Sequence, residues 1–597
     1  MSTPQLPFDD SRRLAGWNPY FADVGAALET QGIAVDDELL ARWRDRVMQA
    51  RSWLDWPDGA IVARRHAGGA SLALAAPVDQ LLTATEVDEW ALLAACEGMA
   101  SPFHAPGHPA AWDADSASRT LRALAAGERN PRLAGLWRAT HARGLDLLFD
   151  DEAATVGAGD GARTWPLQRL PAADEVPWAS LRDVPVALIT GSNGKTTTTR
   201  LLTAMLRAQG RHVAHTCTDG VFVDGALVAG GDYSGPAGAR AALRAPGIDA
   251  AVLETARGGL LRRGLAVQHA DVAVVTNISD DHFGEYGIHD LSDLAFAKIA
   301  VARALRSDGW LVLNADDPLL RAQAGAGLPG RIAWFALDAD TPLPRAHRAG
   351  GGATCGGRDG RLVLHVEGAD RDLGAIDAMP LTLGGSARYN IANLAAAALA
   401  AHRLGVDIGA MVEVAARFGA RAEDNPGRLQ LVRLGDVSVL VDYVHNADGW
   451  NSLADVLDRL RGGRLGLMLG HAGNRGDAEL RDVAQAVAEL HPDHVVLKDI
   501  GGMLRGRQPG DVARVLRDAL IAKGVDVGAV AVQLDEYAAV CDLLAWAQPG
   551  DLLVLPVHGS VARKHVAMLL DALRAAHWRA GRAFDASGTA PPEPPPA

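Results

Sequence analysis

The sequence has 597 residues, of which 48% are hydrophobic and 22% are charged, and its formal net charge is −14. This length predicts several domains with ample apolar cores, and the acidic balance argues against a nucleic-acid-binding surface, which needs basic charge. The four cysteines are widely separated and form no CxxC pair, so we expect neither a structural zinc site nor a disulfide framework.

The first 20 residues lack the apolar core of a signal peptide, and no run approaches the roughly 18 apolar residues of a transmembrane helix. We therefore expect a cytoplasmic protein that binds neither membrane nor nucleic acid. A homo-oligomer is compatible with the sequence.

Residues 1–178 are expected to form an α-rich α+β domain. Apolar residues at helical spacing predict helices at 37–54, 84–99 and 116–126. We interpret the many tryptophans here as packing residues, and no group in this segment has the spacing of a catalytic site. The acidic, proline-flanked stretch 171–177 predicts a linker.

An apolar strand at 184–189 leads into a glycine-rich turn, which opens a helix at 196–209. The turn and helix start read Gly191-Ser192-Asn193-Gly194-Lys195-Thr196-Thr197. Backbone N–H groups of such turns bind phosphate, Lys195 would neutralise its charge, and Thr196 would bind Mg²⁺. The pattern is GxxGKT, because Ile189 stands where the longer phosphate-loop pattern has glycine. A glycine turn before a helix is often only structural, but Gly-Lys-Thr in this context favours a nucleotide site.

Residues 179–424 predict a P-loop α/β domain with a mainly parallel sheet. Its expected elements are strands at 184–189, 250–254, 272–276 and 310–314, a hairpin at 218–225, a β-rich excursion at 338–379 and a helix at 391–404. Residues 425–585 predict a second, Rossmann-like lobe with strands at 437–441, 465–469, 494–497 and 552–555. The proline-rich tail 586–597 is expected to be disordered.

Polar residues follow two of the predicted strands. Glu254 ends one strand, and Asp280-Asp281-His282 follow the next. Ligands of doubly wound sheets sit at the carboxyl ends of strands, so these groups would hold Mg²⁺ or orient phosphate. The structural alternatives are a capping or salt-bridge role for Glu254 and a polar helix-capping loop for the second group.

Lys298 lies on an otherwise apolar helix, where a lysine is commonly solvated or snorkelling. Asn390 and Asn393 share one face at the start of a helix, so they would either bind a base or ribose or cap the helix.

Arg428 stands at the joint between the two α/β segments, where an arginine can clamp phosphate. Asp442, His445 and Asn446 follow a strand of the last lobe. A structural loop is the alternative for both groups.

Taken in chain order, these residues resemble the Mur ligase family. The similarity covers about residues 179–583 and is greatest to the C-terminal, Mur-type half of cyanophycin synthetases. The strings that carry it are Thr218-Asp219-Gly220, Leu253-Glu254-Thr255-Ala256-Arg257-Gly258-Gly259, Val275-Thr276-Asn277-Ile278-Ser279-Asp280-Asp281-His282 and Leu504-Arg505-Gly506-Arg507-Gln508-Pro509-Gly510.

The resemblance implies an ATP- and Mg²⁺-dependent amide ligase that joins a small-molecule or peptide carboxylate to an amine or amino acid through an acyl phosphate. It implies that Lys195, His282 and Lys298 are catalytic and that Thr196, Glu254, His282 and Lys298 hold metal, with Lys298 carbamylated. The implied nucleotide contacts are residues 191–197, Asn390, Arg428 on phosphate and Asp442 on ribose. His445 and Asn446 would lie at the closing cleft, towards the substrate.

Two departures from the family pattern limit these expectations. The ATP-grasp domain that cyanophycin synthetases carry before their Mur-type half has no counterpart here, which leaves a non-catalytic, ATP-binding scaffold as the alternative function. In addition, Ala447-Asp448 follow His445-Asn446 where the family commonly has proline. Acidic Asp448, Asp477 and Asp499 are candidate receptors for a basic amine.

Overall fold

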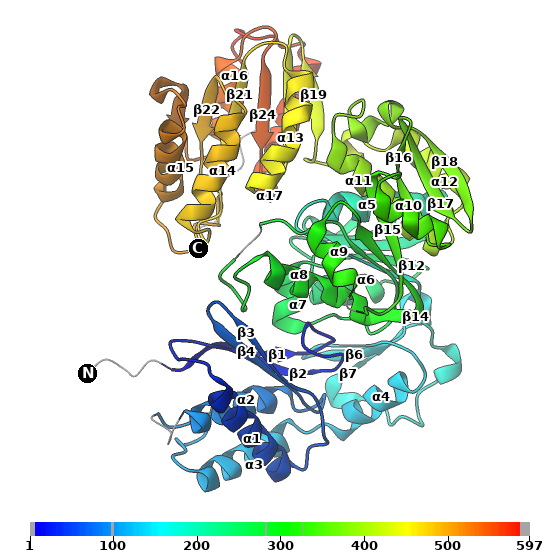
Figure 1. Cartoon of the computed structure of the whole chain (residues 1–597), viewed down its shortest axis with the longest axis vertical. Coiled ribbons are helices and arrows are strands. Elements are labelled where there is room, and N and C mark those ends of the chain that lie inside the picture. The colour runs from blue at the N-terminus through cyan, green and yellow to red at the C-terminus, as the bar shows by residue number, and fades with distance from the viewer. Residues whose placement is uncertain (1–5, 97–100, 281–282, 326, 585–597) are drawn as a thin grey trace.

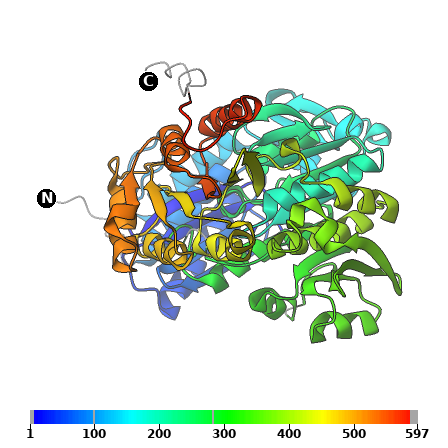
Figure 2. The same ribbon diagram turned by 90° about the horizontal axis from the view of Figure 1, so that it is seen from above.

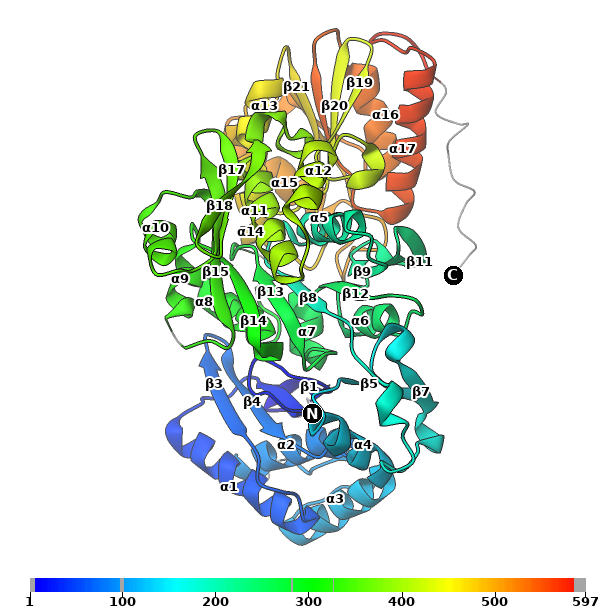
Figure 3. The same cartoon turned by 90° about the vertical axis from the view of Figure 1, so that its right-hand side faces the viewer.

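The computed structural model describes residues 6–96, 101–280, 283–325 and 327–584. Three regions stack along the long axis of the molecule, with the N-terminal region (β1 to η2, 8–169) at one end and the C-terminal lobe (β19 to α17, 430–575) at the other (Figure 1). The central region (β8 to α12, 186–417) lies between them, as the side view also shows (Figure 3). The tail predicted to be disordered lies outside the described residues.

The N-terminal region combines helices with two small antiparallel sheets, of strand order β1-β2-β4-β3 and β5-β6-β7. Its strands are β1 (Phe8–Leu14), β2 (Gly25–Thr30), β3 (Ile61–His66), β4 (Gly69–Ala75), β5 (Leu147–Phe149), β6 (Ala153–Val156) and β7 (Arg163–Pro166), and its helices are α1 (Asp37–Leu54), α2 (Leu81–Ala95), α3 (Ala114–Glu128) and α4 (Pro131–His141). The first predicted helix has the observed bounds, the second begins three residues earlier than predicted, and the third extends two residues beyond its predicted bounds at each end. The end of the helix predicted at 84–99 falls partly outside the described residues.

The central region is built on one sheet of eleven strands, ordered β11-β10-β9-β12-β8-β13-β14-β15-β16-β17-β18. These are β8 (Val186–Thr190), β9 (Val213–Cys217), β10 (Gly220–Val223), β11 (Ala226–Gly230), β12 (Ala250–Glu254), β13 (Ala270–Val275), β14 (Leu305–Asn314), β15 (Arg331–Asp338), β16 (Thr354–Arg358), β17 (Arg361–Val366) and β18 (Ala369–Ala375). The seven neighbouring strands β9-β12-β8-β13-β14-β15-β16 of this order pair in parallel, as predicted for most of the sheet. The β-rich excursion at 338–379 therefore extends the main sheet, with one helix inserted.

Helices cover both faces of this sheet, because its central strands are apolar on both sides. One face packs against α5 (Lys195–Ala208), α11 (Arg388–Arg403) and α12 (Ile408–Arg417). The other packs against α6 (Pro236–Leu243), α7 (Arg257–Arg263) and α8 (Leu291–Ile299). The short helices α9 (Pro318–Ala324) and α10 (Pro342–Ala349) complete the region.

The C-terminal lobe has a six-stranded sheet of order β19-β20-β24-β21-β22-β23, in which only the pair β19–β20 is antiparallel. Its strands are β19 (Gln430–Leu434), β20 (Val437–Asp442), β21 (Leu465–Leu469), β22 (His494–Leu497), β23 (Val530–Val532) and β24 (Leu552–Pro556). Helices α13 (Ala447–Leu460), α14 (Asp477–Glu489) and α15 (Asp511–Ala522) cover one face, and α16 (Glu536–Trp546) and α17 (Ser560–Ala575) cover the other. Seen from above, this lobe overlies the other two regions (Figure 2).

The predicted fold class, a P-loop α/β domain followed by a Rossmann-like lobe and preceded by an α+β region, is confirmed. Each sheet lies within one predicted domain, while the domain boundaries stay predictions. No helix among the described residues combines the length and the apolar character needed to cross a bilayer.

Candidate active site

The glycine-rich turn occupies the centre of the carboxyl edge of the large sheet. It follows β8, which pairs with β12 on one side and with β13 on the other. Because all three strands are parallel, their ends meet at one edge, where doubly wound sheets bind ligands. Glu254 at the end of β12 and Thr276 after β13 therefore flank the turn.

Two glycines of the turn are required by close packing. Gly191 has φ +145°, and a Cβ there would lie 1.8 Å from Thr276 Oγ1. Gly194 has φ +83°, and a Cβ there would lie 2.3 Å from Asn393 Oδ1. Gly194 is also the N-cap of α5 and offers no side chain, so no side chain caps the helix start. The first amides of α5 are thus available to an anion.

Side chains from the segment after β13 hold the turn in place. Asn193 N donates to Asn277 Oδ1 at 2.9 Å, and Thr276 Oγ1 donates to the Asn193 carbonyl at 2.6 Å. Ser192 Oγ donates to the Ser279 carbonyl at 2.8 Å. The turn is therefore fixed before any ligand arrives.

Two lysines converge on the turn. Lys195 Nζ donates to the carbonyls of Gly191 and Ser192, both at 2.9 Å. Lys298 Nζ, from α8, donates to the same Gly191 carbonyl at 2.8 Å, and its residue is only 1% exposed. The solvated or snorkelling interpretation of Lys298 is therefore wrong.

Beside the lysines, Thr196 and Glu254 form a buried oxygen cluster. Thr196 Oγ1 donates to Glu254 Oε2 at 2.7 Å, and Thr218 Oγ1 donates to Oε1 at 3.3 Å. Burial raises the pKa of Glu254, although Lys195 and Arg428 act against this shift. Glu254 caps no helix, since α7 has Ala256 as its N-cap, and within the described residues it forms no salt bridge. A carboxylate with only hydroxyl partners suits a hard cation.

The two asparagines of α11 are bonded to each other. Asn393 Nδ2 donates to Asn390 Oδ1 at 3.0 Å, and Asn390 Nδ2 donates to the Leu381 carbonyl at 3.0 Å. Neither caps the helix, because the N-cap is Ala387. Both nevertheless line the cleft described below.

The C-terminal lobe brings a second set of groups to the turn. The guanidinium of Arg428 lies 4.7 Å from the ring centroid of Tyr443, and that of Arg563 lies 5.1 Å from it. Asp442 Oδ2 accepts the Leu429 amide at 2.7 Å, and burial raises its pKa. Arg428 and Asp442 thus face the glycine-rich turn from across the joint.

Direct hydrogen bonds connect the glycine-rich turn to the C-terminal lobe. Asn193 Nδ2 donates to Asp448 Oδ2 at 2.8 Å, and Asn446 Nδ2 donates to Asn193 Oδ1 at 3.3 Å. Asn446 also caps α13 by accepting the Gly449 amide at 2.8 Å. His445 lies beside it, with Nδ1 3.1 Å from the Tyr443 carbonyl oxygen.

These groups line one cleft of about 1360 Å³ between the central region and the C-terminal lobe. The predicted residues in its lining are Ser192, Asn193, Gly194, Lys195, Thr196, Thr197, Glu254, Lys298, Asn390, Arg428, Asp442 and His445. Gly191 and Asn446 are not among the lining residues, and predicted His282 lies outside the described residues. Asp448 lines the cleft, whereas Asp477 pairs with Arg507 and Asp499 accepts the Gly510 amide, both away from it.

A buried triad that sequence patterns did not reveal lies at the wall of the cleft, where its member His558 is one of the lining residues. Lys498 Nζ pairs with Glu536 Oε1 and lies 3.1 Å from His558 Nδ1, while His558 Nε2 lies 3.0 Å from the Val444 carbonyl. Burial lowers the pKa of both Lys498 and His558. The triad fixes the loop that carries Tyr443. Only the lysine directly after an apolar strand hints at it.

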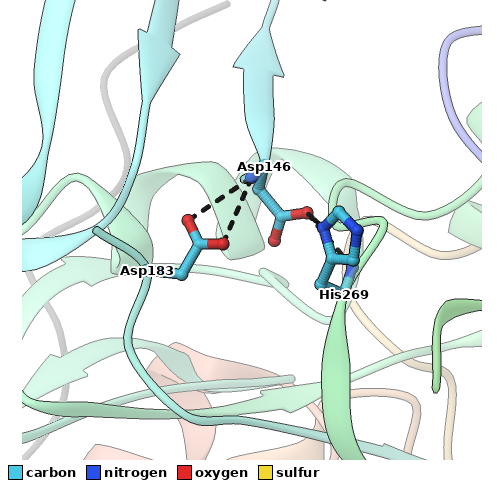
Figure 4. Close-up of side chains that lie close together, drawn as sticks. All are labelled: Asp146, Asp183 and His269. Carbon is cyan, nitrogen blue, oxygen red and sulfur yellow. Dashed lines mark hydrogen bonds and ion pairs between the residues drawn. The ribbon is translucent and has the colours of Figure 1, made fainter. Parts of the chain in front are cut away.

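At the opposite end of the central region, Asp146, Asp183 and His269 gather where the N-terminal region meets the large sheet (Figure 4). Asp146 Oδ1 accepts the amides of Gln268 and His269 and lies 3.0 Å from His269 Nδ1. The Asp146 amide donates to Asp183, which also pairs with Arg306 at 3.3 Å. Because these oxygens are engaged by protein donors, we interpret the cluster as a structural junction.

Comparison with known proteins gives consistent matches. Residues 189–401 match the Mur ligase middle domain, and residues 427–556 match the Mur ligase, glutamate ligase domain. The cyanophycin synthetases of Geminocystis herdmanii and Crocosphaera subtropica are 36% and 37% identical over 372 and 373 residues. Each alignment covers 62% of this chain and 42% of the relative, so the chain spans less than half the length of these relatives.

More distant matches include the UDP-N-acetylmuramoyl-L-alanyl-D-glutamate--2,6-diaminopimelate ligase of Pseudomonas aeruginosa. It is 30% identical over 317 residues, which are 52% of this chain and 61% of the relative. Among solved structures, E. coli FolC in complex with DHPP and ADP aligns with a TM-score of 0.47 and 20% identity, covering 65% of this chain and 89% of that chain.

Proposed function

Because the chain belongs to the Mur ligase family, whose middle and C-terminal domains it carries at residues 189–401 and 427–556, we propose that it is an ATP-dependent amide ligase. A carboxylate oxygen attacks the γ-phosphorus of ATP, and the bond to ADP breaks, giving an acyl phosphate. An amine then attacks the acyl carbon and loses a proton as phosphate leaves. The observation that carries this proposal is the convergence of Lys195, Lys298 and Glu254 on the uncapped start of α5.

The residues of the first cleft suit a nucleoside triphosphate. The uncapped amides of α5 can donate hydrogen bonds to phosphate oxygens. Within the part of the chain that the structure describes, Lys195 Nζ is held only by two backbone carbonyls, so it can turn to a phosphate without leaving a buried carboxylate unpaired. Arg428 adds positive charge from the C-terminal lobe, and Asp442 is proposed to bind ribose. Asn390 is proposed to contact the nucleotide from α11.

The residues present also suit a bound Mg²⁺ ion. Thr196 and Glu254 offer hard oxygen ligands, and the buried Glu254 carboxylate has only hydroxyl groups as hydrogen-bond partners among the described residues. When bound, the metal would neutralise charge on the transferring phosphoryl group. His282 is proposed as a further ligand, and Lys298 as one if it is carbamylated. Carbon-13 NMR with labelled bicarbonate tests this, with a carbamate signal expected that Lys298→Met abolishes.

The C-terminal lobe is proposed to complete the site. Tyr443 and His445 face the turn across the cleft, and Asn446 and Asp448 are bonded to Asn193. We propose that the contact of Asn446 and Asp448 with the turn positions the acyl group beside the amine and excludes water. Water would otherwise hydrolyse the acyl phosphate before the amine reacts. The reaction is proposed for the cytoplasm, where the four free thiols stay reduced.

The experiment combines purified protein, ATP, Mg²⁺ and a mixed pool of carboxylates and amines. We expect ADP and phosphate to appear only when both substrates are present, with an amide product identified by mass spectrometry. Lys195→Ala should lower the rate more than about 100-fold, as expected for loss of a phosphate-binding charge. Release of AMP and pyrophosphate would contradict the acyl-phosphate route. A Lys195→Ala protein that keeps its role in the cell would favour the scaffold alternative.

A further inference from the structure

A second cleft, of about 1120 Å³, lies on the other side of α5 and shares no lining residue with the first. Its walls are the outer face of α5 and the β9–β10 turn from the central region, together with α17 and β19 from the C-terminal lobe. The segment 421–427, which joins the two regions, forms part of its floor. Neither the glycine-rich turn (residues 191–197) nor Glu254 contributes to this cleft.

Positive charge gathers at the inner end of the second cleft. Asp219 pairs with Arg200 of α5 at 2.7 Å and with Arg563 of α17 at 2.6 Å. These guanidiniums and that of Arg428 hold the pKa of Asp219 below its usual range despite its burial. One carboxylate therefore faces three guanidinium groups, in a place where Arg200 is only 8% exposed. Exposed Arg207 and Lys564 add further positive charge at the rim.

The wall also holds unpaired polar groups. Arg200 Nη1, Arg563 Nε and Thr203 Oγ1 are buried and have no hydrogen-bond partner among the described residues. Buried donors without acceptors are rare in folded proteins. A ligand that satisfies them must bring acceptor oxygens, and planar guanidiniums suit a phosphate or a carboxylate.

Apolar side chains form one side of the second cleft, among further charged residues of both signs. Phe222 stacks on buried His215 with 4.7 Å between ring centroids, and Phe418, Val414 and Leu570 contribute further apolar surface. The cleft thus offers a cationic end and an apolar side, a combination typical of small-molecule sites.

We propose that this second cleft binds a small molecule with a phosphate or carboxylate head on an apolar body. This site is separate from the glycine-rich turn. The head contacts Arg200 and Arg563, the rim charges of Arg207 and Lys564 attract it electrostatically, and the body lies along Phe222 and Phe418. Because one wall belongs to each region, the bound molecule ties α5 to α17. It therefore favours the arrangement in which the C-terminal lobe is closed on the turn.

Calorimetric titration of the full chain with phenyl phosphate, phenylacetate and inorganic phosphate tests this. We expect phenyl phosphate or phenylacetate to bind at least tenfold more tightly than inorganic phosphate, and the better of the two identifies the head group. The double variant Arg207→Gln/Lys564→Gln changes only exposed residues, and it should weaken this binding at least tenfold. Arg514→Gln, which removes an exposed arginine of α15, is the matched control and should bind normally.

The variant Lys195→Ala separates the two clefts. Binding that persists in Lys195→Ala and is lost in the double variant supports the second site. Hydrogen exchange should then show probe-dependent protection of residues 200–211 and 560–574. Binding that is lost in Lys195→Ala and kept in the double variant would place the probe at the glycine-rich turn and overturn the proposal. The absence of binding by all three probes would overturn it as well.

Discussion

Asn193 of the glycine-rich turn donates a hydrogen bond from Nδ2 to Asp448 Oδ2 at 2.8 Å, although 255 positions separate the two residues. Asn446 bonds to the same asparagine, so the start of α13 is attached to the turn. The C-terminal lobe therefore touches the segment proposed to hold phosphate, and closure of the lobe and binding at the turn are linked.

Replacing Asp448 tests this link. A hydrogen bond to a charged group contributes about 1.5–3 kcal/mol, so Asp448→Ala should lower kcat/KM for ligation by about tenfold or more. The free energy of unfolding should change little, because the bond joins two separate cores. Asp458→Ala, an exposed residue of the same helix that does not line the cleft, is the control. Equal losses in both variants, or none in Asp448→Ala, would contradict a specific link.

Glu254→Gln tests the proposed metal site. Glutamine still accepts the Thr196 hydroxyl, so the fold should be retained, but the charge that suits Mg²⁺ is removed. A loss of about 3 kcal/mol of stabilisation corresponds to a rate roughly 100-fold lower. Initial rates measured against Mg²⁺ concentration check this, with circular dichroism as the control for folding. An unchanged Mg²⁺ dependence would show that the metal binds elsewhere.

Glu536→Ala is expected to destabilise the C-terminal lobe. It leaves the fully buried Lys498 without its counter-charge and removes the acceptor of the His558 and Gly559 amides. Breaking a buried pair costs about 3–5 kcal/mol, which urea unfolding followed by tryptophan fluorescence can measure. The double variant Lys498→Met/Glu536→Leu should recover much of this loss. A change below about 1 kcal/mol in the single variant would mean that water enters the triad.

The junction in Figure 4 should make stability depend on pH. Burial first, and then the neighbouring Asp146, raises the pKa of Asp183 to about 7. Between the ordinary carboxyl pKa of about 4 and this value, the folded state keeps a proton that the unfolded state has lost. The contribution of Asp183 is therefore fully present below about pH 4 and is lost as the pH rises through 7.

Thermal unfolding of wild type and Asp183→Asn from pH 4 to pH 8 measures this effect. The variant should show a flatter profile, because its amide does not titrate. Asp174→Asn, an exposed residue of the same region, should leave the profile as it is. A wild-type midpoint that rises over this range to the same extent as that of Asp183→Asn would contradict the assignment.

Local patterns made much of the site predictable. Short apolar runs identified β8, β12 and β13, and parallel strands bring their polar carboxyl ends to one edge, so Lys195 and Glu254 were expected to lie together. Contacts between the two regions were not predictable in this way, because no periodicity links Asn193 to Asp448 or Asp219 to Arg563, which are 344 positions apart. The pairing of Asn390 with Asn393 shows the same limit: their spacing indicated a shared face but not that they would bond to each other.

The central claim is that a carboxylate is activated by phosphorylation, and oxygen-18 tests it most directly. The substrate pool is prepared with both carboxylate oxygens labelled and incubated with ATP, Mg²⁺ and amines, and the released phosphate is analysed by mass spectrometry. The account predicts one labelled oxygen in each phosphate released, in step with amide formation. Label in AMP, or unlabelled phosphate released while amide forms, would contradict it.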